Sequence, residues 1–379
     1  MAGRSLPFQF VKAAALSAAF SLFASPVLAA PVAPAWLDEQ VEQIHEEYGL
    51  IALGAGVLKV GGEPVVAAAG TESSNSNTPV AKGASWHIGS NTKALTALLY
   101  GRLVEQGVAE WGTSVASLFD DEVNSIDPAW DEVTIEDLFA HRSGAGQIGP
   151  VWLLSRASDE SPLTEQRLAT VRARLAERPP GETGAFEYSN LNYIIAGSAI
   201  EVITGLRWEE AIREHIFETE GGDWADGWGF GAPQSGPIGH NTVFGFKVAA
   251  GRGSGADNPP ALGPAGTAHA PIKSHLRLLA QFVDERSTIM TEATRQKLLA
   301  PWPDQQADYA MGWGVGTREG LGGIYAHRGS NTMWLSHVEL VPQEDTVLIV
   351  NTNLYTDTSI EAVGALVSAI EAQLAASAD

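Results

Sequence analysis

Two side chains three positions apart, Ser90 and Lys93, form the pair in this sequence best suited to nucleophilic chemistry. A serine hydroxyl becomes a good nucleophile when a neighbouring base takes its proton, and an unprotonated lysine amine can be that base. Residues i and i+3 share one face of a helix, so the two side chains meet if a helix begins near Ser90. The N–H groups of a helix start disfavour an ammonium and stabilise an oxyanion. The spacing favours acyl transfer through Ser90, although a capping serine followed by a surface lysine gives the same pattern.

The residues after Ser90 indicate how this pair would be held. From Ser90 to about Glu105 the sequence is helical, with apolar residues almost all the way round. A helix that is apolar on every side is buried in the fold. A buried lysine at the start of such a helix needs a reason, and a catalytic site supplies one.

Two later triplets contain polar groups that could complete the site. The triplet Y-S-N at 188–190 stands where a loop enters a predicted helix, and H-R-G at 327–329 ends a predicted strand just before Ser330. In chain order the motifs read S-x-x-K, Y-x-N and H-x-G. This order resembles the penicillin-recognising serine hydrolases, the superfamily of class C β-lactamases, D-alanyl-D-alanine carboxypeptidases and related esterases and D-amino-peptidases. The resemblance covers essentially all of residues 35–375, including the segments WHIGSNTKALTALL, VTIEDLFAHRSG and HRGSNTMW.

The resemblance implies roles for the residues of the first two motifs. Ser90 would be the acylated nucleophile, and Lys93 and Tyr188 would form its proton network. The phenol of Tyr188 would act as general base or relay, with its ionised form favoured by a neighbouring ammonium. Asn190 would orient Lys93 and the substrate amide.

The third motif supplies the oxyanion side of the implied site and is also where the sequence departs from the family. Backbone N–H groups of Ser90 and Ser330 would form the oxyanion hole, and His327 and Gly329 would line the substrate side. His327 stands where the family usually has a charged lysine that can hold a substrate carboxylate, and histidine is only partly protonated at neutral pH. Arg328 would point to the opposite face of the strand and has no hydroxyl. These changes weaken the case for a strong β-lactamase, and they are compatible with a carboxypeptidase, D-amino-peptidase, amidase or esterase.

Strand-like runs occur near both ends of the chain, with helices between them. Two apolar β-type runs at 50–60 and 64–70 are joined at a Gly-Gly pair, and the chain ends with strand-like runs at 310–317, 324–328, 334–341 and 346–351 and a helix at 359–375. We therefore expect an α/β fold of the α+β type, with a mainly antiparallel sheet flanked by helices, built from both termini, and an inserted, mostly helical domain. The expected division is a discontinuous sheet domain of residues 30–106 and 290–379 and an inserted domain of residues 107–289.

The first 29 residues are predicted to be a signal peptide. A weakly basic start precedes an apolar run from Ala13 to Ala24, and small residues follow at the spacing of a cleavage site after Ala29 or Ala30. We expect a periplasmic or secreted protein with no stable membrane span after cleavage, since no later stretch reads as a span. The formal net charge of −22 disfavours nucleic-acid partners, and the absence of cysteine excludes disulfides and thiolate sites. The sequence leaves the oligomeric state open.

Other candidate sites are weaker. His141 in the segment HRSG could be proposed as a base for Ser90, but it is more typical of a residue that braces the loop after a helix. The remaining histidines show no metal-ligand spacing, so neither a metal nor a cofactor is expected. The Trp-rich segment 224–230 could line an acyl pocket or pack in the core.

Together the motifs predict an exported serine hydrolase that cleaves an ester or amide through an acyl-Ser90 intermediate. Its substrate would be a small molecule or a peptidoglycan-type peptide. A class C-like β-lactamase is an alternative, and a non-catalytic penicillin- or peptidoglycan-binding sensor is an alternative of another class. A scaffold with a dead site is disfavoured because Ser90, Lys93, Tyr188 and Asn190 are all present.

Overall fold

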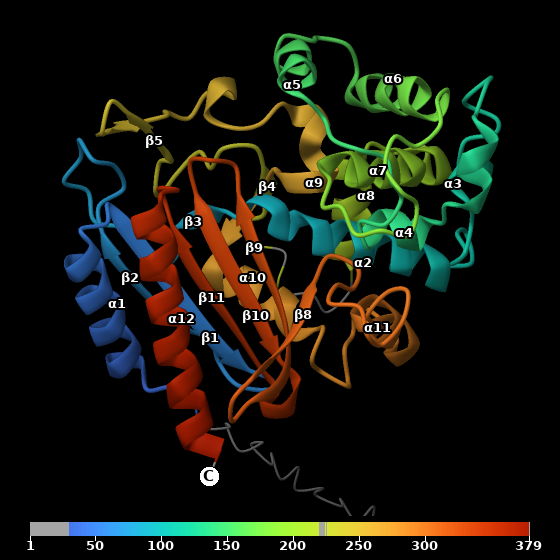
Figure 1. Ribbon diagram of the computed structural model, residues 1–379. Helices are drawn as coiled ribbons and strands as arrows, with labels where there is room; N and C mark the ends of the chain where they lie inside the picture. Colours follow the sequence, from blue (N-terminus) through green and yellow to red (C-terminus); the bar gives the residue numbers. More distant parts are fainter. Residues whose placement is uncertain (1–29, 220–223, 225, 379) are drawn as a thin grey trace, which may run out of the picture.

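A six-stranded sheet runs through the centre of the fold (Figure 1). The structure is a computed structural model that describes residues 30–219, 224 and 226–378, so the predicted signal peptide at 1–29 lies outside the described residues. Neighbouring strands are antiparallel, in the order β2-β1-β11-β10-β9-β8. The strands are β1 (Ala52–Lys59), β2 (Val65–Gly70), β8 (Gly314–Arg318), β9 (Gly322–Ser330), β10 (Leu335–Val341) and β11 (Thr346–Thr352). Both ends of the chain thus meet in one sheet, which confirms the predicted fold class.

Helices cover both faces of this sheet. On one face lie α1 (Pro34–Tyr48) and α12 (Asp357–Ala378), and on the other lies α10 (Ile272–Ala280). Alternate residues of β11 serve the two faces: Leu348 packs in the apolar cluster of α1 and α12, whereas Ile349 packs in the cluster that contains α10. Since both faces are covered, β10 and β11 are buried along their whole length.

The composition of α12 corrects one sequence expectation. By length and composition alone, residues 357–377 could cross a membrane, although the sequence was expected to contain no such stretch after the signal peptide. The inward residues Ala362, Leu366 and Ile370 are fully buried against the sheet. The apolar character of α12 is therefore explained by its packing as a core helix.

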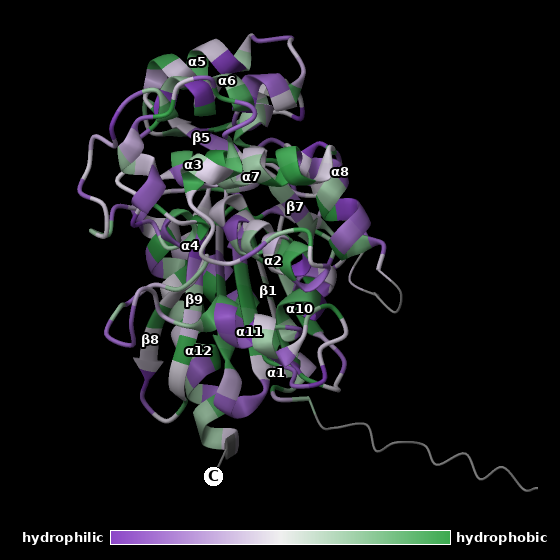
Figure 2. Ribbon diagram, turned by 90° about the vertical axis from the view of Figure 1, so that its right-hand side faces the viewer, coloured by the Kyte–Doolittle hydropathy of each residue, from purple (hydrophilic) through white to green (hydrophobic). Residues whose placement is uncertain are grey.

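Most of the remaining helices gather at one end of the sheet, with α5 and α6 farthest from it (Figure 2). Among the described residues between 88 and 313, the α-helices other than α10 are α2 (Thr92–Glu105), α3 (Val115–Leu118), α4 (Ile135–Phe139), α5 (Pro150–Ala157), α6 (Leu163–Leu175), α7 (Asn190–Thr204), α8 (Trp208–Ile212), α9 (Gly263–Gly266) and α11 (Glu292–Leu299). Local sequence signals fix several of their ends. Thr134 and Asp137 form a capping box at the start of α4, and α7 ends at Gly205, whose φ of 69° suits glycine.

The helix α10 departs from the simple picture of a sheet domain with a helical insertion. Its residues 272–280 fall inside the predicted insertion at 107–289, yet Ile272 and Leu276 pack against the six-stranded sheet. A Cβ atom at Gly56 in β1 would lie only 2.5 Å from the Ile272 side chain. Packing therefore associates α10 with the sheet, and the division of the chain into domains stays a prediction.

Among the residues that the structure describes, five short strands lie outside the central sheet. β3 (Ser85–His87), β7 (Ala268–Pro271) and β4 (Gly229–Phe230) form a three-stranded sheet, and β5 (His240–Val243) and β6 (Phe246–Ala249) form a hairpin. The tryptophans at 224 and 228 are both buried. Trp228 stacks on Phe217 at 5.0 Å between ring centroids and meets His275 edge-on at 5.3 Å. The described part of the Trp-rich segment therefore packs in the core.

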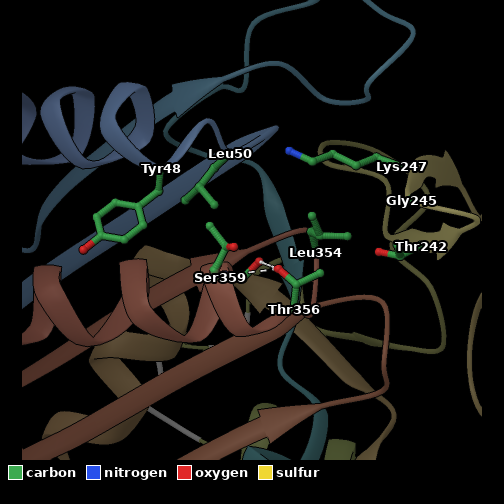
Figure 3. Close-up of a pocket in the computed structure, with 9 residues that line it drawn as sticks. Tyr48, Leu50, Thr242, Gly245, Lys247, Leu354, Thr356 and Ser359 are labelled. Atoms are coloured by element: carbon green, nitrogen blue, oxygen red, sulfur yellow. Dashed lines mark hydrogen bonds between the residues drawn. The ribbon is translucent and has the colours of Figure 1, made fainter.

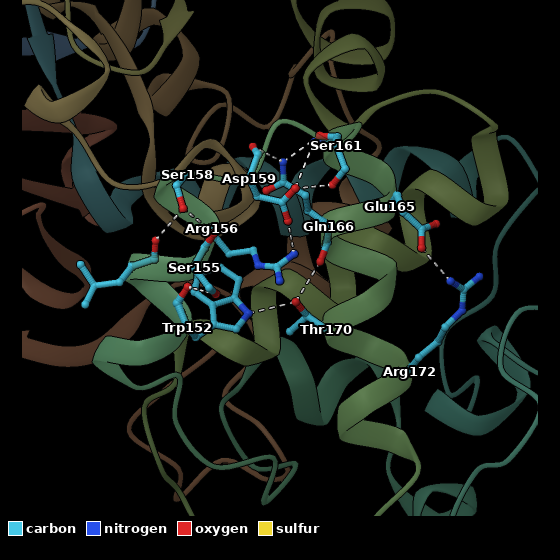
Figure 4. Close-up of polar contacts among 11 residues, drawn as sticks. Trp152, Ser155, Arg156, Ser158, Asp159, Ser161, Glu165, Gln166, Thr170 and Arg172 are labelled. Carbon is cyan, nitrogen blue, oxygen red and sulfur yellow. Dashed lines mark hydrogen bonds and ion pairs between the residues drawn. The ribbon is translucent and has the colours of Figure 1, made fainter.

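The outermost helix, α5, packs its Trp152 side chain against the core and makes polar contacts with its neighbours (Figure 4). It has no buried residue. Trp152 Nε1 donates to Thr170 Oγ1 on α6 at 3.0 Å, and Arg156 pairs with Asp159 at 2.6 Å. Exposed ion pairs and single hydrogen bonds contribute little stability, so α5 is peripheral to the core.

Candidate active site

Ser90 lies in the turn that joins β3 to α2. A single 3-10 turn, Gly89–Asn91, leads directly into the α-helix, so Ser90 occupies the helix start that the sequence predicts. Gly89 adopts a φ of 53°, which glycine reaches without strain. The Thr92 hydroxyl donates to the Gly89 carbonyl at 2.7 Å and so stabilises the turn. Ser90 itself remains partly exposed.

The Lys93 amine contacts Ser90 from the protein interior. Its Nζ lies 3.0 Å from Ser90 Oγ, 2.7 Å from Asn190 Oδ1 and 2.8 Å from the Ala265 carbonyl oxygen. The side chain is fully buried, and this burial lowers the pKa of Lys93 well below its usual value.

The hydrogen bonds of Lys93 accommodate an ammonium, which has three donors, and also the uncharged amine that a general base requires. A neutral amine has two N–H donors and one lone pair. The Ala265 carbonyl can only accept, and the Asn190 carbonyl oxygen faces the amine as a second acceptor. The Ser90 hydroxyl oxygen is the third acceptor. When the amine is deprotonated, its two donors can stay on the two carbonyl oxygens, and the lone pair then faces the Ser90 hydroxyl, as a general base requires.

Tyr188 lies beside this amine but carries its own proton. The Lys93 Nζ is 4.9 Å from the centroid of the Tyr188 ring. Burial raises the pKa of Tyr188 to about 12, and a hydrogen bond with Ser90 opposes the shift. The expected role of the phenol as general base or relay stays a prediction, and the raised pKa of Tyr188 favours its protonated form at neutral pH.

Two glycines allow the backbone segments that carry the expected oxyanion amides to lie in direct contact. A Cβ atom at Gly89 would lie 2.3 Å from the Ser330 nitrogen, and one at Gly329 would lie 2.8 Å from the Ser90 nitrogen. Contacts this short are possible only because neither residue has a Cβ. The end of β9 thus lies directly against the turn that carries Ser90, as an oxyanion hole built from these two amides needs.

His327 lies on β9 as an uncharged imidazole. Its Nδ1 is 3.0 Å from Asn91 Oδ1, and the Asn91 amide nitrogen donates to Ser336 Oγ at 2.9 Å. This orientation of Asn91 makes Nδ1 the protonated ring nitrogen and leaves Nε2 as an acceptor. Burial, together with the Lys93 and His337 side chains, lowers the pKa of His327 to about 3. The residue therefore cannot replace the positive charge of the family's lysine at neutral pH.

The depressed pKa of His327 makes folding stability depend on pH in a defined window. Between about pH 3 and 6.5 the unfolded chain binds a proton at His327 that the folded chain does not, so stability falls as pH falls by up to about 1.4 kcal/mol per pH unit. We expect His327→Gln, which keeps a donor for Asn91, to lose less stability than the wild type between neutral pH and about pH 4. Urea unfolding at both pH values measures this difference. An identical loss in the two proteins would contradict a neutral, buried His327.

His141 does not reach Ser90 but supports the segment that carries Tyr188. Its Nδ1 accepts from the Ser189 N–H at 3.2 Å, and its ring centroid lies 4.3 Å from that of Tyr188. The Ser189 hydroxyl in turn accepts from the Leu191 N–H at the start of α7. His141 therefore braces the loop that positions Tyr188 and Asn190.

Several residues of the site carry no signal that sequence reasoning could use. Asn91, which orients His327, stands inside the S-x-x-K motif at a position where any residue fits the pattern. The Ala265 partner of Lys93 is a backbone carbonyl, which every residue type has. His87 and Asp257 lie 170 positions apart and meet only in the fold.

No cluster suited to a metal ion is present among the described residues. A cavity of about 270 Å³ lies elsewhere, between the end of α1, the β5–β6 hairpin and the start of α12 (Figure 3). It is lined by Tyr48, Leu50, Lys247 and Ser359 among others, and none of the predicted site residues borders it. The chemistry of Ser90 is therefore not located in this cavity.

Comparison with known proteins agrees with this arrangement. An unguisins hydrolase of Aspergillus campestris is 31% identical over 154 residues, a match that covers 39% of this chain and 28% of that protein. The chain thus spans little more than a quarter of the first curated relatives that it matches. Penicillin-binding protein 4 of Amycolatopsis lactamdurans is 25% identical over 307 residues, covering 73% of this chain and 76% of that protein.

The fold also matches solved structures. The D-amino acid amidase of Ochrobactrum anthropi SV3 superposes with a TM-score of 0.71 at 20% identity, covering 90% of this chain and 99% of that one. Residues 37–371 match the family model described as Beta-lactamase. The chain therefore belongs to the beta-lactamase family.

Proposed function

We propose that the protein is an amidase or esterase that forms an acyl-Ser90 intermediate. The observation that carries this proposal is the contact of 3.0 Å between Ser90 Oγ and the buried Lys93 amine, which is also held by the Asn190 and Ala265 carbonyl oxygens. Lys93 takes the hydroxyl proton as Oγ attacks the carbonyl carbon of the substrate. The resulting oxyanion is held by the Ser90 and Ser330 N–H groups.

The leaving group needs a proton, and Tyr188 is placed to supply it. Its phenol is protonated at neutral pH and hydrogen-bonds to Ser90. As the carbonyl–nitrogen or carbonyl–oxygen bond breaks, the phenol protonates the departing atom, and the Lys93 ammonium restores the phenol proton. Water then attacks the acyl ester, Lys93 takes the water proton, and Ser90 leaves as the restored hydroxyl. Asn190 holds the amine in place throughout.

The charge of the third motif selects among substrates. The family's lysine can hold a substrate carboxylate, but His327 is neutral and buried, and Arg328 on the same strand is exposed on the other face. We therefore favour substrates whose leaving side carries no carboxylate, such as amides of amino acids and simple esters. The family's carboxypeptidase and class C β-lactamase activities rank below these. The names of the relatives, an unguisins hydrolase and a D-amino acid amidase, support amide hydrolysis.

A substrate panel tests the proposal. We expect purified protein to hydrolyse a p-nitrophenyl ester and an amino acid amide, with slower turnover of nitrocefin and of a D-alanyl-D-alanine peptide. Intact-mass measurement after exposure to a fluorophosphonate should show one adduct, absent in Ser90→Ala. A stable penicillin adduct without any turnover would instead support the sensor. Absence of both adduct and turnover would support the scaffold and end the enzyme proposal.

Export completes the proposal, because residues 1–29 have the pattern of a signal peptide. Cell fractionation of the tagged full chain, with sequencing of the mature N-terminus, tests it. A protein that retains residues 1–29 in the cytoplasm would contradict export.

A further inference from the structure

We propose that His87 and Asp257 form a positioning pair that holds the two oxyanion amides in register. The proposal rests on the proposed acyl transfer through Ser90. Neither side chain contacts Ser90 itself, so both would act through the backbone. The pair links the turn before Ser90 to the turn after Ser330, which are distant in sequence.

One end of the link is the turn that carries Ser90. The His87 Nδ1 accepts from the Gly89 N–H at 3.1 Å, and its Nε2 lies 2.9 Å from Asp257 Oδ2. A backbone N–H can only donate, so Nδ1 is the unprotonated nitrogen and Nε2–H donates to the carboxylate. The His87 side chain is 0% exposed and that of Asp257 is 4% exposed.

The other end is the turn that follows Ser330. Asp257 Oδ1 accepts from Asn331 Nδ2 at 2.7 Å, and Asn331 Oδ1 accepts from the N–H groups of Met333 and Trp334 at 3.1 and 3.2 Å. The Trp334 ring then stacks on His87 at 5.3 Å between centroids. The contacts of His87, Asp257, Asn331 and Trp334 therefore form a closed ring that joins the Ser90 turn to the turn after Ser330.

The cost of this arrangement suggests a function beyond packing. A buried carboxylate is expensive to desolvate, and apolar residues of similar size usually serve a core at least as well. Here the Asp257 carboxylate accepts hydrogen bonds from side chains of two separate turns and so fixes the distance between the two turns. Because an oxyanion hole works only when both donors point at one oxygen, a small displacement of either amide lowers the rate sharply.

The variant Asp257→Asn tests the pair with almost no change in volume. His87 and Asn331 donate to different oxygens of Asp257, and an amide has only one oxygen, so it cannot keep both contacts. Any tautomer change at His87 would place an N–H against the Gly89 N–H. We expect kcat to fall roughly 10- to 100-fold with KM nearly unchanged. The affinity for a phenylboronic acid, which forms a tetrahedral adduct with serine, should fall by the same factor.

Two further variants separate this role from general stability. Glu136→Gln alters another buried carboxylate, which accepts a hydrogen bond of 2.9 Å from the Gly112 N–H and does not contact the Ser90 turn. This variant should keep the wild-type kcat. His87→Phe keeps a ring on Trp334 but breaks the pair. We expect His87→Phe and the double variant His87→Phe with Asp257→Asn to lose about as much kcat as Asp257→Asn alone, because the two residues act as one unit.

The outcomes distinguish this proposal from the one it rests on. If Ser90→Ala keeps wild-type turnover, the proposed function itself fails. If Ser90→Ala is inactive while His87→Phe and Asp257→Asn keep the wild-type kcat and boronate affinity, only the positioning role fails. The positioning role would also be overturned if the two losses of kcat multiplied in the double variant, or if only KM changed. Should Asp257→Asn not fold, His87→Phe decides by the same readouts.

Discussion

We expect Lys93→Met to lower kcat/KM by roughly 10³- to 10⁴-fold, because the amine in contact with the Ser90 hydroxyl is lost. Methionine has a similar length and no charge, so it suits the buried position. Steady-state kinetics on the best ester or amide of the panel measures the effect. Lys82→Met, at an exposed lysine paired with Asp38, is the matched control and should keep wild-type activity.

The same variant reports the protonation state of Lys93 through stability. The pKa of Lys93 is depressed in the folded protein, so between that value and about 10.4 the unfolded chain binds one proton more and wild-type stability rises with pH. Lys93→Met removes this dependence. We therefore expect the stability of the variant relative to the wild type to decrease as pH rises from neutral toward about 10. A constant difference across this range would show that Lys93 stays charged and is no general base.

The second large effect is expected for Gly329→Ala, which should lower kcat roughly 10²- to 10³-fold. The added Cβ would lie 2.0 Å from the Ile88 carbonyl oxygen and 2.8 Å from the Ser90 nitrogen. Both contacts are with backbone atoms, which cannot turn away as a side chain can. The strand must then move from the Ser90 turn, and the two oxyanion amides separate.

The effect of Gly329→Ala is measured by steady-state kinetics together with thermal unfolding. The clash should also lower the melting temperature, so the activity of the folded fraction is compared at a temperature where both proteins are folded. Gly364→Ala on α12 is the control: its Cβ meets nothing within 4 Å, and the substitution should stabilise by about 0.5–1 kcal/mol without changing kcat. Wild-type turnover in Gly329→Ala would contradict an oxyanion hole at this position.

Much of the local structure could be predicted from the sequence because it follows from contacts between near neighbours. The buried character of α2, the capping box at Thr134 and the end of α7 at Gly205 all depend on residues within a few positions. The alternating and apolar runs near both termini predicted the antiparallel sheet. Pattern alone could not assign α10, since an amphipathic helix shows that one face is buried but not which surface covers it.

The sequence by itself determined the chemical groups and their order: a serine with a lysine one turn later, a tyrosine and asparagine at a helix start, and a histidine before a glycine. Only the tertiary structure decided their charge states and their distances. Burial lowers the pKa of Lys93 and of His327, desolvation raises the pKa of Tyr188, and both depend on the whole fold. The contacts of Lys93 with the Ala265 carbonyl and of His87 with Asp257 join distant segments, and no local pattern encodes such contacts.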